Sequence, residues 1–322
     1  MRCLIAYLRD KGLCKSAVHT PTSAELIIAN FRQYLDRQCG LASGTADHHC
    51  KGALSFLAHR FKGQVVDPSA IGPADVISYV QECARHMSIR SLQQTTASLR
   101  SFFRYALFRG EIIESLICAV PAVARWATTP PLPRAISPEH ARKAIESCDV
   151  STATGQRDRA ILLMLARLGL RGGEVNALLL EDVIWESGHI RVLGKNREEC
   201  LMPLPCDVGE AIADYLQHGR PTCDDRHLFL RSRAPHRGLL HGSDGVGSVV
   251  RSALRRAGVD SIHKGSHQFR HALAVQLLQK GASLHEISDV LRHRSQSSTT
   301  IYAKVGLDAL RPLAMPWPGS TS

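Results

Sequence analysis

Apolar residues recur about every 3.6 positions in four stretches of the first third of the chain, and this spacing predicts four amphipathic helices. In the last stretch Leu99, Phe102 and Phe103 share one face, while arginines lie on the others. The four predicted helices span residues 23–37, 46–60, 73–86 and 91–108. Helices that bury one face against each other predict a four-helix bundle with a basic outer face.

A proline-rich stretch ends this pattern. Residues 121–138 carry five prolines, which disfavour helix and strand and predict an extended linker. A chain of 322 residues is long enough for two domains. We therefore place an N-terminal helical domain at residues 1–125, the linker at 126–137 and a second domain at 138–322.

The second domain is predicted to be mainly helical with one small sheet. Ser137, followed by proline and glutamate, starts a helix, and Ser283 with Glu286 forms a capping box for a helix that ends near Arg292. Residues 188–205 alternate around a polar Gly-Lys-Asn centre, which predicts a β-hairpin. Further helices are predicted at residues 157–169, 209–218, 243–257 and 267–280. The fold class is therefore mainly α with a small antiparallel β-sheet (α+β), in two domains.

The charge of the chain favours a polyanionic partner. Lysine and arginine total 40 against 29 acids, a net charge of +11. Such an excess is typical of proteins that bind nucleic acid, although many basic proteins bind nothing specific. Residues 1–125 are the more densely basic part, with 15 basic and 9 acidic side chains. Nucleic acid is thus the favoured partner, most strongly for the N-terminal domain.

Several classes of protein are disfavoured by what the sequence lacks. No apolar run is long enough to span a membrane and no secretory signal is present, so we expect a cytoplasmic protein. The ten cysteines are scattered without a C-x-x-C pair, which predicts neither a disulfide framework nor a zinc site. The sequence contains no P-loop, H-E-x-x-H or G-x-S-x-G motif. We therefore expect a reaction without ATP hydrolysis, metal ion or cofactor.

A few polar residues are candidates for chemistry. Arg171 follows the apolar run ILLMLARLGL, at the end of a predicted buried helix, and precedes two glycines that would let a backbone approach closely. Its guanidinium could bind a phosphate bidentately, or could cap the helix or pair with Glu174. Lys195 is predicted at a hairpin tip, where a lysine is usually only solvated. His267 and Arg270 are three residues apart and so share a helix face. None of these signals decides a function alone.

Together with a later histidine and tyrosine, these residues resemble the tyrosine recombinases, also called phage integrases, and within them the Xer-like group. The chain matches the family's order of Arg, Lys, His-x-x-Arg, His and Tyr with Arg171, Lys195, His267, Arg270, His293 and Tyr302. The sequences that carry the resemblance are GLRGGEVNALLLEDV, VLGKNREECLMPLP, SHQFRHALA and LRHRSQSSTTIYAKV. The separations of 24 residues (171 to 195), 23 (270 to 293) and 9 (293 to 302) also fit the family.

The resemblance is close over residues 137–312 and concerns only architecture in the N-terminal domain, which is similar to the family's core-binding domain. Two positions depart from the family pattern. Phe269 stands where leucine is usual, and Arg292 stands where the family often has glycine, which adds a charge beside the predicted site. Neither departure removes a catalytic group.

The resemblance implies a site-specific DNA recombinase or integrase of a mobile genetic element, which cleaves and rejoins strands through a covalent 3′-phosphotyrosyl intermediate. Tyr302 would be the nucleophile, because a phenolate leaves more readily than an alkoxide when the strand is resealed. Arg171 and Arg270 would bind the non-bridging phosphate oxygens. The resemblance implies that His267 accepts the tyrosine proton and that Lys195 protonates the leaving 5′ hydroxyl. It also implies that His293 donates a hydrogen bond to the phosphate.

The implied partner is double-stranded DNA, bound by a homo-tetramer on two DNA sites, with the two domains forming a C-shaped clamp around the duplex. The tail, residues 306–322, would dock on a neighbouring protomer or pack on its own domain. Two other functions stay open: a type IB topoisomerase-like enzyme that relaxes DNA, and a catalytically inactive DNA-binding accessory factor. A nuclease would need a metal-binding cluster of carboxylates, which the sequence does not contain.

Overall fold

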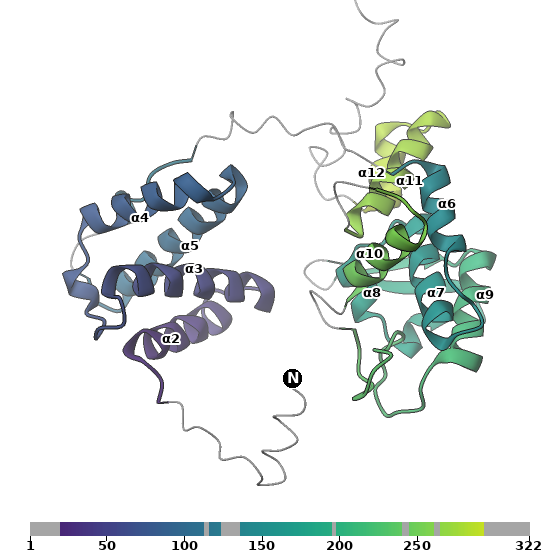
Figure 1. Cartoon of the computed structure of the whole chain (residues 1–322), viewed down its shortest axis with the longest axis horizontal. Helices are drawn as coiled ribbons and strands as arrows, with labels where there is room; N and C mark the ends of the chain where they lie inside the picture. Colours follow the sequence, from purple (N-terminus) through teal and green to yellow (C-terminus); the bar gives the residue numbers. More distant parts are fainter. Residues whose placement is uncertain are drawn as a thin grey trace, which may run out of the picture. The chain divides into compact units, whose positions relative to one another are not determined.

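The computed structural model describes residues 20–112, 116–123, 136–194, 198–239, 245–260 and 265–292. They divide into two compact units, one before and one after residue 130 (Figure 1). No helix within these ranges is long and apolar enough to cross a membrane. The predicted linker at 126–137 lies almost wholly outside the described residues, as does the tail, so both stay predictions.

The N-terminal unit contains the four helices that the apolar spacing predicts. They are α2 (Ser23–Arg37), α3 (Ser43–Phe61), α4 (Pro73–His86) and α5 (Ile89–Phe108), with a 3₁₀ turn at Pro68–Ala70. The inner faces of α2, α3 and α5 meet in an aromatic cluster whose ring centroids lie 5.2 to 6.4 Å apart, a range in which aromatic pairs attract each other. Its members are Phe31, Phe56, Phe102, Phe103 and Tyr105. The predicted bundle is thus confirmed.

The C-terminal unit is mainly helical with one antiparallel sheet, as predicted. Its helices are α6 (Pro138–Glu146), α7 (Ala153–Arg167), α8 (Gly172–Ala177), α9 (Cys206–Asp214), α10 (Val246–Arg256), α11 (His267–Gln279) and α12 (Leu284–Leu291). A 3₁₀ turn at Leu180–Asp182 leads into the sheet, and a π-helical turn at Tyr215–Gly219 continues α9. The three strands are β1 (Val183–Ile184), β2 (His189–Leu193) and β3 (Glu199–Pro203), in the order β1-β2-β3. Strands β2 and β3 form the predicted hairpin, with Ile190 opposite Met202.

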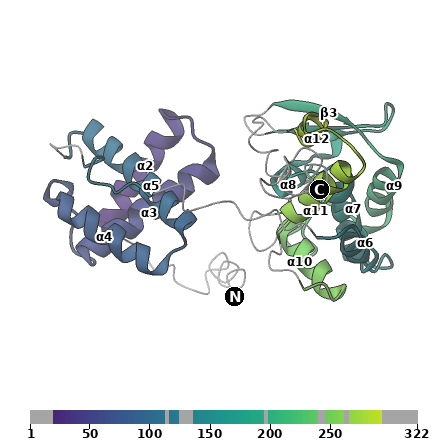
Figure 2. The same ribbon diagram turned by 90° about the horizontal axis from the view of Figure 1, so that it is seen from above.

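Helix α7 is the centre of this unit. The consecutive residues 160–165 are all buried, so apolar side chains cover every face of the helix there. Helices α6, α9, α10 and α11 pack around it (Figure 2). Such an all-round apolar helix is typical of a domain core, and it gives the functional residues at its end a rigid support.

The ends of α7 differ from the prediction, which placed the helix at 157–169. The helix ends at Arg167 because Gly169 adopts a positive φ of 58°, the left-handed conformation that commonly follows a helix C-cap. Arg171 is therefore not at the end of this helix. It is the N-cap residue of α8, a six-residue helix that the sequence pattern did not predict.

Candidate active site

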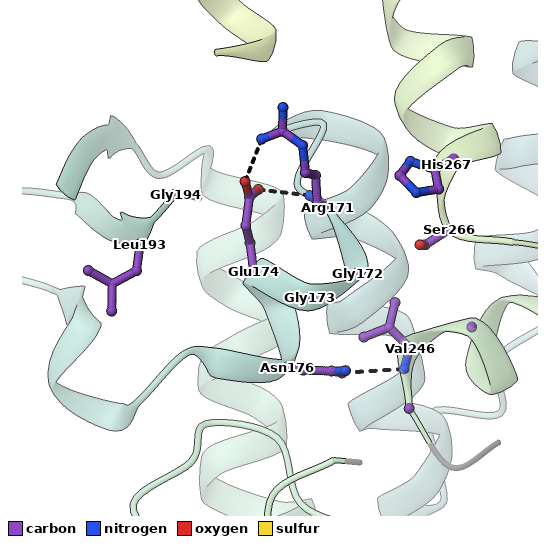
Figure 3. Close-up of a pocket in the computed structure, with 12 residues that line it drawn as sticks. Arg171, Gly172, Gly173, Glu174, Asn176, Leu193, Gly194, Val246, Ser266 and His267 are labelled. Atoms are coloured by element: carbon purple, nitrogen blue, oxygen red, sulfur yellow. Dashed lines mark hydrogen bonds and ion pairs between the residues drawn. The ribbon is translucent and has the colours of Figure 1, made fainter. Parts of the chain in front are cut away.

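The start of α8 lies beside a cavity of about 580 Å³ in the C-terminal unit. The cavity is lined by α8, the end of β2 and the first residues of α10 and α11 (Figure 3). Its described lining residues are Arg171, Gly172, Gly173, Glu174, Asn176, Leu193, Gly194, Gly245, Val246, Gly247, Ser266 and His267. Two of the predicted site residues, Arg171 and His267, thus line one cavity.

Three helices begin at this cavity: α8 at Gly172, α10 at Val246 and α11 at His267. The first N–H groups of a helix carry the positive end of its dipole, so the starts of α10 and α11 add positive potential. Among the described lining residues Glu174 is the one acid. The lining therefore suits an anion.

The first turns of α8 and α11 approach so closely that a side chain at residue 172 would not fit without movement. A Cβ atom at Gly172 would lie 2.7 Å from Ser266 Oγ and 3.3 Å from Ser266 Cβ. The sequence predicted that a glycine here would let a backbone approach closely; the atoms that approach Gly172 belong instead to the side chains of Ser266 and Val246. Because His267 directly follows Ser266, this contact helps to set the distance between Arg171 and His267.

Glu174 is a buried carboxylate that binds two arginines. Its Oε1 accepts a hydrogen bond from Arg171 Nη1 at 2.7 Å, and its Oε2 accepts from the backbone N–H of Arg171 at 2.8 Å and from Arg292 Nη2 at 2.9 Å. Burial by itself raises the pKa of Glu174, but the Arg171 N–H and the charges of Arg292 and Arg171 outweigh it and lower that pKa. The carboxylate is therefore ionised at neutral pH, and two guanidinium groups around it leave one excess positive charge.

Arg171 is the most exposed member of this group. Its side chain is 36% exposed, against 6% for Glu174 and 15% for Arg292. Its Nη2 also donates to the backbone carbonyl oxygen of Arg292 at 3.5 Å. The sequence left phosphate binding and pairing with Glu174 as alternatives for Arg171. The pair is present, and it leaves the guanidinium at the cavity (Figure 3), so the two roles are compatible.

Arg270 has a different environment from Arg171. Its side chain is buried, and its guanidinium donates hydrogen bonds to the backbone carbonyl oxygens of Gly169 and Leu291. These carbonyls lie just after α7 and at the last residue of α12. Arg270 thus joins the ends of two helices. The next residue, His271, has its pKa lowered by burial and by the nearby charges of His267 and Arg270.

The other three predicted residues, Lys195, His293 and Tyr302, lie outside the described residues, and their roles stay predictions. Two contacts at the cavity were not predicted from the sequence. Besides the Gly172–Ser266 approach, the side-chain oxygen of Asn176 accepts a hydrogen bond from the N–H of Val246 at 3.4 Å. Both contacts join segments far apart in the chain, for which one sequence carries no signal.

A metal site is not found in the part of the chain that the structure describes. There, no group of three or more histidine, cysteine, aspartate or glutamate side chains lies close enough to hold an ion.

Both units match family models of known proteins. Residues 134–307 match the family model described as "Phage integrase family", and residues 28–110 match "Phage integrase, N-terminal SAM-like domain". The chain is 44% identical over 323 residues to "Putative integrase/recombinase y4rA" of Sinorhizobium fredii, covering 99% of this chain and 78% of that protein. It is 33% identical over 299 residues to "Tyrosine recombinase XerC" of Oceanobacillus iheyensis, covering 90% and 95%.

A solved structure is also similar in fold. The XerH site-specific recombinase, in a post-cleavage complex with the palindromic difH substrate, matches with a TM-score of 0.65 at 16% identity, covering 93% of this chain and 98% of that one. At this identity the likeness concerns the fold alone.

Proposed function

Because the chain belongs to the phage integrase family of tyrosine recombinases, we propose that it cleaves and rejoins double-stranded DNA at specific sites through a covalent 3′-phosphotyrosyl intermediate. The observation that carries the proposal is the cavity that Arg171 and His267 both line. Its excess positive charge and helix N-termini suit a phosphodiester. In this reaction a tyrosine oxygen attacks the phosphorus, the bond from phosphorus to the 5′ oxygen breaks, and the leaving 5′ oxygen takes up a proton.

Arg171 is the residue best placed to bind the scissile phosphate. Its guanidinium lies at the cavity and is held by Glu174 and by the Arg292 carbonyl, so the side chain loses little conformational entropy when it binds the phosphate. A fixed cation at a partly enclosed site stabilises the charge that develops on the five-coordinate phosphorus, and no reorganisation is needed during the reaction. His267 is exposed at the start of α11, and in the proposed reaction it would accept the tyrosine proton.

The remaining roles rest on the family pattern and on chain neighbours. Gly194, which directly precedes Lys195, lines the cavity, and Arg292, which directly precedes His293, contacts Arg171. This supports Lys195 as the acid for the leaving 5′ hydroxyl and His293 as a hydrogen-bond donor to the phosphate. Arg270 would add positive potential from its buried position, where the low dielectric strengthens a charge.

The burial of other tyrosines and their raised pKa support Tyr302 as the nucleophile. Three are buried in the two cores, and burial raises their pKa; they are Tyr79, Tyr105 and Tyr215. A hydrogen bond with Cys39 raises the pKa of Tyr34, which belongs to the N-terminal unit. A raised pKa disfavours the phenolate that attacks phosphorus. Burial removes three of the six tyrosines as candidates, and the family pattern favours Tyr302 among the others.

The proposal extends to the assembly. As in the family, four copies would act on two DNA sites, with the basic N-terminal unit and the C-terminal unit both contacting the duplex. Integrase relatives favour a role in a mobile genetic element, and a DNA substrate implies action in the cytoplasm.

The test is to trap the covalent intermediate. DNA flanking the chain's own gene is footprinted with the protein, and the protected sequence is made as a nicked duplex from which the released strand diffuses away, so that cleavage does not reverse. The wild-type protein is expected to become joined to this DNA, seen as a shift on a denaturing gel. A protease digest of the adduct should place the nucleotide on the peptide that contains Tyr302.

The variants separate chemistry from binding. Tyr302→Phe should abolish the adduct and leave the footprint unchanged, whereas the matched control Tyr34→Phe should form the adduct at the wild-type rate. Arg171→Ala should slow cleavage by roughly 100-fold or more while binding changes much less. An adduct formed by Tyr302→Phe, or a nucleotide found on Tyr7, would show that the nucleophile is wrongly assigned.

A plasmid assay distinguishes the rival activities. A plasmid with two copies of the protected site should undergo strand exchange. Relaxation of a one-site plasmid without exchange between two sites would instead indicate a topoisomerase. Binding without any adduct would indicate an inactive accessory factor.

A further inference from the structure

Arg292 occupies a backbone position that is costly for any residue with a side chain. It follows the last residue of α12 with φ 53° and ψ 50°, in the left-handed region where glycine meets no steric penalty. Among the described residues only Lys62 is another non-glycine residue with positive φ, and it is exposed at the end of α3. A strained arginine here needs a compensating interaction.

The side chain of Arg292 turns inward to the candidate site. Its Nη2 donates to Glu174 Oε2 at 2.9 Å, across 118 positions of sequence. Glu174 in turn binds the side chain and the backbone N–H of Arg171, and Arg171 returns a hydrogen bond to the Arg292 carbonyl oxygen. The three residues therefore form a closed ring in which the strained backbone and the side chain of Arg292 both take part.

The ring also balances the negative charge of Glu174 at the site. A lone Glu174 carboxylate would neutralise Arg171, the cation that the proposed function uses on the phosphate. With Arg292 on its second oxygen, Glu174 is shared between two cations, and one positive charge is left for a ligand of the cavity. Arg292 does not itself line the cavity, and its Nε and Nη1 are buried, so a direct contact with DNA does not fit its geometry.

We propose that Arg292 is a positioning residue for strand cleavage: it balances the charge of Glu174 and holds Glu174, and through it Arg171, in the orientation that presents the Arg171 guanidinium to the scissile phosphate. The role rests on the proposed function of the same site. It does not require Arg292 to touch the substrate.

The decisive variant is Arg292→Gly, because glycine suits the backbone at this position. If Arg292 only ended the helix, glycine would preserve or raise the melting temperature and leave cleavage unchanged. We expect the melting temperature to be kept, DNA affinity to stay within about twofold, and the single-turnover cleavage rate at saturating DNA to fall about tenfold or more. Arg292→Lys, which keeps a cation next to Glu174, should recover part of the rate.

A double-mutant cycle with Glu174→Gln tests whether Arg292 acts through Glu174. Glu174→Gln should slow cleavage by itself, and adding Arg292→Gly to it should have little further effect, because the carboxylate that Arg292 balances is gone. Fully additive effects would overturn the proposal. So would a weaker DNA affinity of Arg292→Gly with a salt dependence reduced by about one phosphate contact, which would show a direct contact with DNA.

A crystal structure of Arg292→Gly makes the test independent of cleavage. The Arg171 guanidinium should leave its present place beside the cavity or lose its order. If Arg171 stays in place, the positioning role is wrong even if the protein is an active recombinase. If Arg171 moves but the wild-type protein forms no DNA adduct, the ring is as proposed and the proposed function fails instead.

Discussion

The close approach of α8 and α11 predicts that Gly172→Ala damages the site although alanine is the better helix former. The new Cβ would lie 2.7 Å from Ser266 Oγ, 3.3 Å from Ser266 Cβ and 3.6 Å from Val246 Cβ. The first distance is far below an ordinary contact, and rotation of the Ser266 hydroxyl leaves the second one tight. The two helix starts must therefore separate by a few tenths of an ångström.

The expected magnitude follows from two opposing terms. Alanine in place of glycine inside a helix gains at most about 1 kcal/mol, and less at the first helical position. Overpacking of a tight contact typically costs about 1–3 kcal/mol. The net effect should be a loss of up to about 3 kcal/mol in the free energy of unfolding. Since Arg171 and His267 flank the contact, a shift of a few tenths of an ångström should slow cleavage about tenfold, given that a misplacement of 1 Å costs roughly 100-fold.

Chemical denaturation and single-turnover cleavage measure these two effects. Gly44→Ala is the matched control, because Gly44 also lies in the first turn of a helix and a Cβ there would meet nothing within 4 Å. It should keep or raise stability and keep the cleavage rate. Gly172→Ala combined with Ser266→Gly, which removes both close atoms, should recover much of both losses. A Gly172→Ala variant that is as stable and active as Gly44→Ala would refute the steric reasoning.

Two further predictions concern the support of the site. Gly169→Ala should lower the free energy of unfolding by about 3 kcal/mol in urea denaturation, because its φ is +58° and a Cβ would lie 2.8 Å from Leu291 Cδ2; an equally stable variant would contradict this. Burial lowers the pKa of His271 from its ordinary 6.5, so the unfolded chain binds a proton that the folded chain does not, and this residue destabilises the fold as the pH falls through 6.5. The stability difference between wild type and His271→Gln should therefore shift against the wild type from pH 7.5 to about pH 5.5, and equal differences at both pH values would count against it.

The elements that the sequence predicted well are those whose signals are local. The capping box of Ser283 with Glu286 uses side chains three residues apart, and the helix after it begins where the box predicts. The bundle helices show a regular apolar face over 14 or more residues. By contrast, α8 has six residues, two of them glycines, and β1 has two residues, so neither is long enough for a periodic pattern.

The site was predicted as a set of residues but not as a geometry. The sequence named Arg171 as a phosphate ligand, Glu174 as a possible partner of Arg171, and Arg292 only as a departure from a usual glycine. The ion pair between Glu174 and Arg292 joins positions 118 residues apart, and only the packing of α8 beside the end of α12 brings them together. A long-range contact of this kind leaves no periodic or local signal in one sequence.

Substitution of the two predicted phosphate-binding arginines would have different structural effects. Arg171 is partly exposed and bonded to Glu174, so its removal changes the charge at the cavity and leaves the cores intact. Arg270 is buried and joins the carbonyls of Gly169 and Leu291, so its removal also leaves two buried acceptors unsatisfied and loosens the ends of α7 and α12. A loss of cleavage therefore indicates a chemical role for Arg171 directly. For Arg270 it does so only if the melting temperature of the variant is unchanged, because the same guanidinium holds the helix that carries His267.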